Sequence, residues 1–230
     1  MIPAVIDYPD RAAQAQALAR DVADALQASI AATGRAVLSV PGGTTPGPFL
    51  RALAGAALHW PAVTVVLNDE RWVPPDHPRS NARLLGETLL TGAAAQATTV
   101  PLYRDAPRPE EGLAAVAWAL RGPALPLDVL VLGMGEDMHT ASLFPGADRL
   151  AEALDPACAE PVLPMRAAGA AEPRITLTLP ALLSARQTHI LITGEEKRVA
   201  LDRACEDGPE AEAPIRAILR RAAPTVHYAP

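Results

Sequence analysis

The chain alternates between long stretches with a helical spacing of apolar residues and short, nearly continuous apolar runs. Between Asp10 and about Thr33 apolar side chains recur every three or four residues, which predicts a long amphipathic helix, and Gly34 provides its stop signal. The short runs end at Pro, Asn or Gly and are typical of strands buried on both faces of a parallel sheet. They span residues 35–40, 63–67 and 129–132.

The remaining periodic segments predict strands that alternate with helices. Residues 175–179 alternate Thr with aliphatic side chains, as a half-exposed strand does, and residues 226–228 are expected to form an edge strand. A further strand is expected at 189–193, with helices at 46–55, 82–90, 109–120, 180–185, 195–205 and 214–221. This order predicts an α/β fold in which helices cover both faces of a mostly parallel sheet. Residues 147–173, rich in Pro and Ala, are expected to form a surface excursion, and residues 1–230 a single domain.

Composition and charge limit the residues that can fill the core and the kinds of partner that the protein can bind. Aromatic residues make up only 3% of the 230 residues, so Ala, Leu and Val must fill the core. The net charge of −6 and the dispersed basic residues argue against a nucleic-acid partner, and no apolar run approaches the ~20 residues that cross a bilayer. Cys158 and Cys205 match no metal-ligand spacing, and because the N-terminus lacks a secretory signal they are expected to be free thiols in a reducing cytoplasm.

The loop at residues 41–46, Pro-Gly-Gly-Thr-Thr-Pro, lies between a predicted strand and a predicted helix. Its two glycines let the backbone bend tightly and approach a ligand. Thr45 is expected to cap the helix, with Pro46 at the first position. Free N–H groups and the helix dipole then favour an anion, typically phosphate. The alternative is an ordinary strand-to-helix turn.

Lys197 supports a phosphate site independently. Thr193 and Glu196 match a capping box, which places Lys197 near the positive end of the following helix. A lysine there costs from a few tenths to about 1 kcal/mol, which a bound phosphate would offset. The alternative is a solvent-exposed lysine held by Glu195 or Glu196.

A polar segment, residues 68–81, leaves the carboxyl end of the second predicted strand. In parallel α/β sheets these ends face the ligand crevice, so the acids, cations and amides of this segment suit a hydroxylated, charged ligand. The alternative is a surface salt-bridge network that ends in a helix cap at Ser80 or Asn81.

The candidate base is His139. An apolar strand, residues 129–132, stops at Gly133, and Asp137 and His139 follow within seven residues. A histidine can take a proton from water near neutral pH, and a neighbouring carboxylate can orient the ring. The alternative is that His139 caps a helix beginning near Thr140. A metal site is disfavoured because no second His or Cys lies at ligand spacing, and no serine lies in a nucleophile-elbow pattern.

Four segments together resemble the 6-phosphogluconolactonase family, in the superfamily shared with glucosamine-6-phosphate deaminase and ribose-5-phosphate isomerase. They are Pro-Gly-Gly-Thr-Thr-Pro at 41–46, Asp-Glu-Arg-Trp-Val-Pro-Pro-Asp-His-Pro at 69–78 with Ser80 and Asn81, Gly-Met-Gly-Glu-Asp-Met-His-Thr-Ala-Ser-Leu-Phe-Pro-Gly at 133–146, and Gly-Glu-Glu-Lys-Arg at 194–198. The second and third are long and specific. The resemblance covers nearly the whole chain. It implies a three-layer, Rossmann-like α/β/α sandwich and cofactor-free hydrolysis of 6-phosphogluconolactone in the oxidative pentose phosphate pathway.

Two positions depart from the family pattern. The family usually has Ser where this chain has Pro41, which removes an N–H donor and a hydroxyl from the loop. The usual Asp-Gly-His reads Asp137-Met138-His139 here. If that position has positive φ, Met138 carries roughly 1–2 kcal/mol of strain. Neither change removes the proposed base or the main phosphate donors.

The resulting hypothesis is ester hydrolysis by direct attack of water on the lactone. His139 is expected to remove the proton from water and Asp137 to orient His139, while the glycine loop and Lys197 hold the 6-phosphate. Arg71 and Arg83 are expected to add positive charge for the phosphate or the developing oxyanion. The residues expected to bind substrate are Gly42, Gly43, Thr44, Thr45, Asp69, Arg71, Asn81, Arg83 and Lys197, of which Asp69 and Asn81 shape the site and contact the sugar.

Two alternatives stay open at this point. A sugar-phosphate isomerase or deaminase of the same superfamily is disfavoured because residues 69–72 read Asp-Glu-Arg-Trp rather than the deaminase-like Asp-Glu-Tyr pattern. A non-catalytic sugar-phosphate sensor is disfavoured because no DNA-binding appendage is visible and both His139 and Asp137 are present. The expected partner is the sugar phosphate alone, for a monomer or small homo-oligomer with no metal, membrane or nucleic acid.

Overall fold

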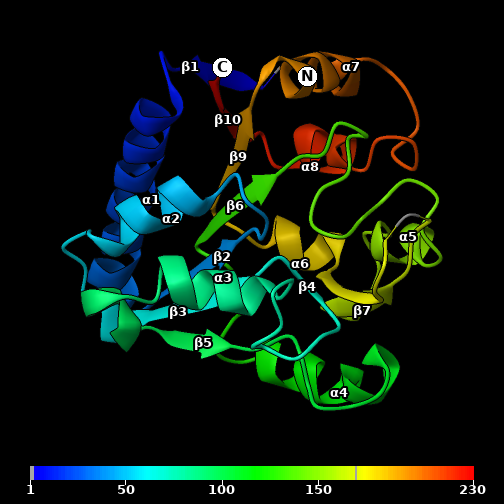
Figure 1. Ribbon diagram of the computed structural model, residues 1–230, viewed down its shortest axis with the longest axis horizontal. Helices are drawn as coiled ribbons and strands as arrows, with labels where there is room; N and C mark the ends of the chain where they lie inside the picture. The colour runs from blue at the N-terminus through cyan, green and yellow to red at the C-terminus, as the bar shows by residue number, and fades with distance from the viewer. Residues whose placement is uncertain (1–2, 169) are drawn as a thin grey trace.

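A parallel sheet forms the centre of the protein, whose computed structural model describes residues 3–168 and 170–230. Within these residues seven strands pair in the order β1-β10-β9-β6-β2-β3-β5, every neighbouring pair parallel (Figure 1). The strands are β1 (Ala4–Asp7), β2 (Ala36–Val40), β3 (Val63–Leu67), β5 (Thr98–Val100), β6 (Val129–Gly133), β9 (Gln187–Thr193) and β10 (Thr225–Ala229). The predicted parallel α/β sheet is confirmed.

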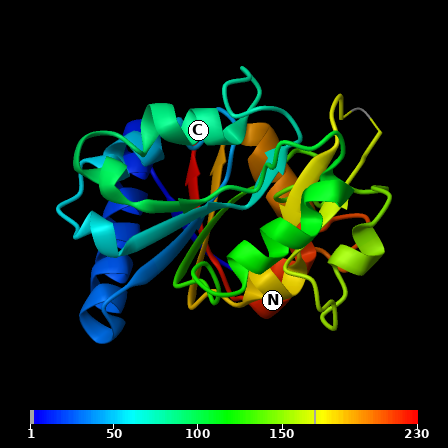
Figure 2. The ribbon, with the colours of Figure 1, turned by 90° about the horizontal axis from the view of Figure 1, so that it is seen from below.

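Helices cover both faces of this sheet. The long α1 contacts β2, β6 and β10 and packs against α2, whereas α7 and α8 pack together on the opposite side (Figure 2). The helices are α1 (Arg11–Thr33), α2 (Gly47–Ala54), α3 (Asn81–Thr88), α4 (Pro109–Leu120), α5 (Leu150–Ala153), α6 (Leu179–Leu183), α7 (Glu195–Cys205) and α8 (Ile215–Arg221), with 3-10 turns η1 (Trp60–Ala62) and η2 (Gly92–Gln96). None of the helices in the described residues is long and apolar enough to cross a membrane.

A second, antiparallel sheet lies beside the carboxyl ends of the central strands. It has the order β4-β8-β7 and is built from β4 (Asp69–Arg71), β7 (Val162–Met165) and β8 (Arg174–Leu177). The expectation of a surface excursion over 147–173 is therefore wrong, because α5 and β7 lie within it. The expectation that β8 is half-exposed is also wrong. Thr176 is fully buried, and its hydroxyl accepts a hydrogen bond from the backbone N–H of Ser142 (3.2 Å).

Three further expectations need correction. The strand β10 is interior, because β1, which the sequence pattern did not reveal, pairs with its outer side. Thr45 does not cap α2, which begins at Gly47 after Pro46 without a side-chain cap. Thr193 does not cap α7 either: Gly194 occupies that position with φ 90°, a conformation that glycine adopts readily.

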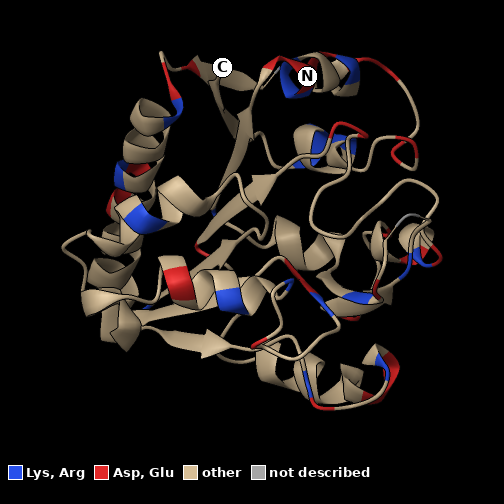
Figure 3. Cartoon of the chain, in the orientation of Figure 1, with Lys and Arg blue, Asp and Glu red and all other residues tan. Residues whose placement is uncertain are grey.

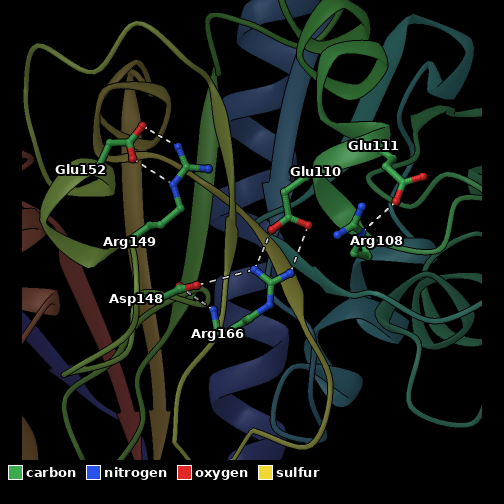
Figure 4. A network of polar contacts seen from close by, with 7 residues as sticks. All are labelled: Arg108, Glu110, Glu111, Asp148, Arg149, Glu152 and Arg166. Carbon is green, nitrogen blue, oxygen red and sulfur yellow. Dashed lines mark hydrogen bonds and ion pairs between the residues drawn. The ribbon is translucent and has the colours of Figure 1, made fainter.

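Charged side chains lie mainly on the outer helices and loops, and the central strands are almost free of them (Figure 3). One surface network joins the start of α4 to Asp148, which precedes α5, and to Arg166, which directly follows β7 (Figure 4). Arg166 makes two bonds to Glu110 (2.6 and 3.0 Å), and its backbone N–H donates to Asp148 (2.8 Å). Exposed ion pairs contribute at most about 1 kcal/mol each. The stability of the fold therefore rests on the buried aliphatic core.

Candidate active site

A cavity of about 260 Å³ opens at the carboxyl ends of β2, β3, β6 and β9. This is the edge at which parallel α/β sheets bind ligands. The cavity is lined by nine of the residues expected from the sequence to form the site: Gly42, Gly43, Thr44, Thr45, Asp69, Arg71, Asn81, His139 and Lys197. Four loops far apart in the chain therefore meet here, as the strand order requires.

Two expected site residues lie outside the lining of this cavity. Asp137 stands behind His139 and contacts it directly. Arg83 lies on α3, where its side chain bonds to Glu87 (2.8 Å) and to the carbonyl oxygen of Asp76 (3.2 Å). The structure does not bring Arg83 together with the other site residues, because its position on the helix directs it along the outer surface of α3.

The glycine loop presents free backbone donors to the cavity. Gly43 has φ 87°, and a Cβ at Gly42 would collide with the side chain of Asn81, so both positions require glycine. Within the described residues, the N–H groups of Gly43, Thr44 and Thr45 donate no hydrogen bond. Three unpartnered donors in one short loop form a concave site that suits an anion.

Lys197 faces the same cavity from the first turn of α7. Burial lowers the pKa of its ammonium group, and Glu136 opposes this only in part. Desolvation of this half-buried cation is costly, so an anion that enters the cavity gains a favourable partner. The loop and the lysine together make one end of the cavity an anion site.

His139 and Asp137 form a hydrogen-bonded pair. Asp137 Oδ1 lies 2.5 Å from His139 Nδ1 and also accepts the backbone N–H of His139 (3.2 Å). This contact lowers the pKa of the Asp137 carboxyl. When Nδ1–H donates to Asp137, Nε2 is the nitrogen left to accept a proton. A Cβ at Gly135 would collide with both side chains, so glycine is needed there for the pair to form.

The turn that carries this pair is strained at Met138. Its φ of 63° is the left-handed conformation that glycine adopts without penalty. The strain of roughly 1–2 kcal/mol that the sequence predicts for a positive φ at Met138 therefore applies. The side chain is nevertheless buried. The Met138 carbonyl oxygen accepts the backbone N–H of Ile215, which ties the turn to α8 (3.1 Å). No helix follows His139 directly, which removes the helix-cap alternative.

Several residues of the site escaped sequence reasoning. Arg174, on β8, lines the cavity, and Ser142 anchors the His139 loop by donating to Asp69 (2.5 Å). Glu70 is buried, and its carboxylate accepts the backbone N–H groups of Asn81 and Ala82 at the start of α3 (both 2.7 Å). Burial raises the pKa of Glu70. Only the pairing of β4 with β8 brings Arg174 here, and no local motif signals that pairing.

No cluster of three or more His, Cys, Asp or Glu side chains in the described part of the chain has the arrangement of a metal site. The groups that line the cavity include a hydrogen-bonded imidazole, two guanidinium groups, an ammonium group, a carboxylate, an amide, two hydroxyls and backbone N–H donors. Such a set can bind an anionic substrate and move one proton.

Fold and site define a class: a parallel α/β domain in which the strand ends bring a glycine loop, a lysine and a histidine–aspartate pair to one cavity. A family model described as glucosamine-6-phosphate isomerases/6-phosphogluconolactonase matches residues 9–227. The chain belongs to this family.

Two relatives and one solved structure are 6-phosphogluconolactonases. The chain is 51% identical over 212 residues to the 6-phosphogluconolactonase of Mesorhizobium japonicum, covering 92% of this chain and 88% of that protein. It is 48% identical over 225 residues to that of Rhizobium meliloti, covering 97% of each. A crystal structure of a 6-phosphogluconolactonase from Shewanella baltica superposes with a TM-score of 0.96 over 100% of both chains, at 35% identity. These likenesses confirm the expected family and fold class.

Proposed function

We propose that the protein hydrolyses 6-phosphogluconolactone to 6-phosphogluconate, the lactonase step of the oxidative pentose phosphate pathway. The observation that carries the proposal is the His139–Asp137 pair, 2.5 Å apart, on the wall of the cavity that also holds the glycine loop and Lys197. The cavity thus joins a proton acceptor to an anion site. The relatives named 6-phosphogluconolactonase, 51% and 48% identical, support the same reaction.

The phosphate provides the anchor in this proposal. It binds the N–H groups of residues 43–45 and the ammonium group of Lys197, and its charge offsets the cost of burying that lysine. Because the phosphate is bound, the lactone ring takes a fixed position relative to the other groups that line the cavity. Placement of an already reactive ester by a remote group supplies a large part of the rate enhancement.

His139 then acts as the general base. Its Nε2 removes a proton from water as the water oxygen attacks the lactone carbonyl carbon, and Asp137 stabilises the imidazolium that forms. Asp69 and Asn81 shape the pocket wall: Asn81 Nδ2 donates to the Asp69 carbonyl oxygen (2.9 Å). Arg71 adds positive charge on the same wall, whereas Arg83 lies outside the cavity and has no part in the proposal.

The proposal places the reaction in the cytoplasm. Cys158 and Cys205 are both free thiols, which agrees with a reducing compartment. The partner in this mechanism is the sugar phosphate, bound by the residues that line the cavity.

The deciding experiment measures hydrolysis of freshly prepared 6-phosphogluconolactone, with 6-phosphogluconate dehydrogenase as the coupling enzyme. The wild-type protein should exceed the spontaneous rate, and His139→Ala should lower kcat by about 10²–10⁴-fold because the base is gone. Lys197→Ala should mainly raise KM. The exposed His59 offers a matched control, since His59→Ala removes an imidazole far from the site.

Two results would contradict the proposal. A wild-type rate equal to the spontaneous rate would defeat the lactonase assignment, and an undiminished rate in His139→Ala would defeat the role of the base. Incubation with glucosamine 6-phosphate and with ribose 5-phosphate tests the isomerase and deaminase alternatives in the same experiment. We expect no turnover of either.

A further inference from the structure

Two arginines face each other across the small sheet. In the β4–β8 register, Arg71 lies directly opposite Arg174, and both side chains line the cavity. Like charges directly opposite in an antiparallel pair destabilise the pairing. Within residues 3–168 and 170–230, the Nε atoms of both side chains are buried without a hydrogen-bond partner. An arrangement this costly implies an anion in the cavity that compensates for it.

The two arginines are not equivalent. Arg71 Nη1 donates to the carbonyl oxygen of Arg79 (2.6 Å), so one end of that guanidinium is already occupied. Among the described residues, the ion pair of Arg174 is a long one with Asp69 (3.6 Å between Nη1 and Oδ2), and that same oxygen accepts the hydroxyl of Ser142 at 2.5 Å. The Arg174 side chain is 16% exposed. Arg174 is therefore the guanidinium with more free donors toward the cavity.

Phe144 links Arg174 to the candidate base. The Arg174 guanidinium lies over the Phe144 ring, 5.1 Å from its centre, and the His139 ring packs against the same ring at 4.2 Å. Both contacts restrict their side chains, so Phe144 keeps the cation and the imidazole close to each other. The cation therefore lies on the same wall of the cavity as the base.

We propose that Arg174 binds the carbonyl oxygen of the lactone and stabilises the negative charge that develops there. This inference rests on the proposed lactonase function. Water oxygen bonds to the carbonyl carbon, its proton passes to His139 Nε2, and the carbonyl π electrons move to the oxygen that Arg174 binds. The electron pair on that oxygen then re-forms the C=O bond as the bond from the carbon to the ring oxygen breaks, and the ring oxygen takes the proton from His139. The carboxylic acid left on the carbon releases its remaining proton to solvent and becomes the product carboxylate, which Arg174 still holds.

A residue that binds the carbonyl oxygen should respond to different ligand groups than a residue that binds the phosphate. Arg174 should recognise groups at the carboxyl end of a ligand, and it should be indifferent to ligands that have only the phosphate. Two inhibitors make the comparison: 6-phosphogluconate, which has both groups, and sorbitol 6-phosphate, which has a hydroxymethyl group in place of the carboxylate.

The experiment compares Arg174→Gln and Arg174→Lys with the wild-type enzyme. Arg174→Gln should lower kcat about 10²-fold or more, the size of effect seen when an oxyanion donor is removed. Its inhibition constant for 6-phosphogluconate should rise at least ~10-fold, in line with the loss of a charge-assisted hydrogen bond, while that for sorbitol 6-phosphate changes less than about twofold. Arg174→Lys keeps the charge without the planar fork and should recover part of kcat. If Arg174→Gln does not fold, Arg174→Lys provides the same comparison of kcat and of the two inhibition constants.

Arg71→Gln is the matched control, because it removes the same charge from the facing position on the same sheet. It should weaken both inhibitors to a similar extent. If Arg174→Gln also weakens both equally, Arg174 serves the phosphate or the fold, and the inference is wrong. An unchanged kcat in an active Arg174→Gln enzyme overturns it as well, and leaves the lactonase assignment standing. Failure of the wild-type enzyme to hydrolyse the lactone would instead refute the proposed function.

Discussion

Met138 adopts a left-handed conformation next to the candidate base, with φ 63°. Two contributions of opposite sign to the stability of the fold arise at this residue. The backbone strain is worth roughly 1–2 kcal/mol, whereas removing a buried methionine side chain costs about 2–5 kcal/mol. Because Met138 is only 7% exposed, the packing term exceeds the strain. The side chain thus stabilises a turn that its own backbone disfavours.

Replacing Met138 with glycine tests this balance. We expect Met138→Gly to lower the free energy of unfolding by about 2 kcal/mol, since the lost burial outweighs the relieved strain. Urea denaturation followed by circular dichroism measures the difference. A variant more stable than the wild type would show that strain dominates. The activity of the variant also reports whether the buried side chain holds His139 in place.

The residues of the site differ in how far the sequence reveals them. Asp137 and His139 belong to one short motif after a strand, so their proximity follows from local geometry. Arg174 becomes a site residue only because β8 pairs with β4, more than a hundred residues earlier in the chain. Pairings at that separation depend on the whole fold, and nothing near Arg174 encodes them.

Helices and strands also differ in how far the sequence reveals them. The predicted strand at 63–67 and the predicted helices at 109–120 and 195–205 match β3, α4 and α7 residue for residue, because each has a complete periodic pattern with its own end signals. The pattern does not reveal the strands β1, β4, β5 and β7. Each has only three or four residues, too few to show a period, and each is stabilised by pairing rather than by its own composition.

Glu70 shows how one buried side chain can position an entire element. Its carboxylate accepts hydrogen bonds from Arg71 N, Asn81 N, Ala82 N and Ser80 Oγ, at 2.7–3.1 Å. These bonds satisfy two of the free N–H groups at the start of α3, those of Asn81 and Ala82, and join that helix to β4. The position of the Asn81 side chain on the cavity wall therefore depends on Glu70.

Glu70→Gln should be destabilising, although it preserves the shape of the side chain. One of the two acceptor oxygens becomes an amide N–H₂ that faces other donors, at a cost of about 1–3 kcal/mol. KM for the lactone should rise several-fold because Asn81 shifts. Urea denaturation and steady-state kinetics measure the two effects. Glu87→Gln, on the exposed face of the same helix, is the control and should change neither.

At the scale of the whole molecule, two buried histidines connect the edge of the central sheet to its interior. His227 Nδ1 lies 2.9 Å from the Tyr8 hydroxyl, and His227 Nε2 lies 3.0 Å from His189 Nδ1. Burial, with a smaller contribution from His189, lowers the pKa of His227 to about 4. Burial likewise lowers the pKa of His189. Both rings are therefore neutral in the folded protein at pH 7.

This linkage makes the fold sensitive to mild acid. Between pH 6.5 and 4 the unfolded chain binds a proton at His227 that the folded chain does not, so stability falls as the pH falls. For a pKa of about 4 in the folded state and 6.5 in the unfolded state, the loss between pH 7 and pH 5 is about 2 kcal/mol.

Urea denaturation at pH 7 and at pH 5 measures this loss. In His227→Gln the difference between the two pH values should shrink by most of that amount, whatever the stability of the variant at pH 7. His59→Gln, at an exposed position, should keep the wild-type difference. An equal pH dependence in His227→Gln and wild type would assign the acid sensitivity to other groups.

Reagents that modify lysine side chains have one such target in this protein, Lys197, because it is the only lysine among the 230 residues. Its lowered pKa increases the fraction of neutral, nucleophilic amine at a given pH. Acylation of Lys197 should therefore inactivate the enzyme and be blocked by 6-phosphogluconate, and peptide mass spectrometry can follow the Lys197 peptide. Lys197→Arg should resist inactivation by the reagent. Amine coupling to a solid support through this side chain would occlude the cavity. Full activity in protein whose Lys197 is shown by mass spectrometry to be acylated would contradict this expectation.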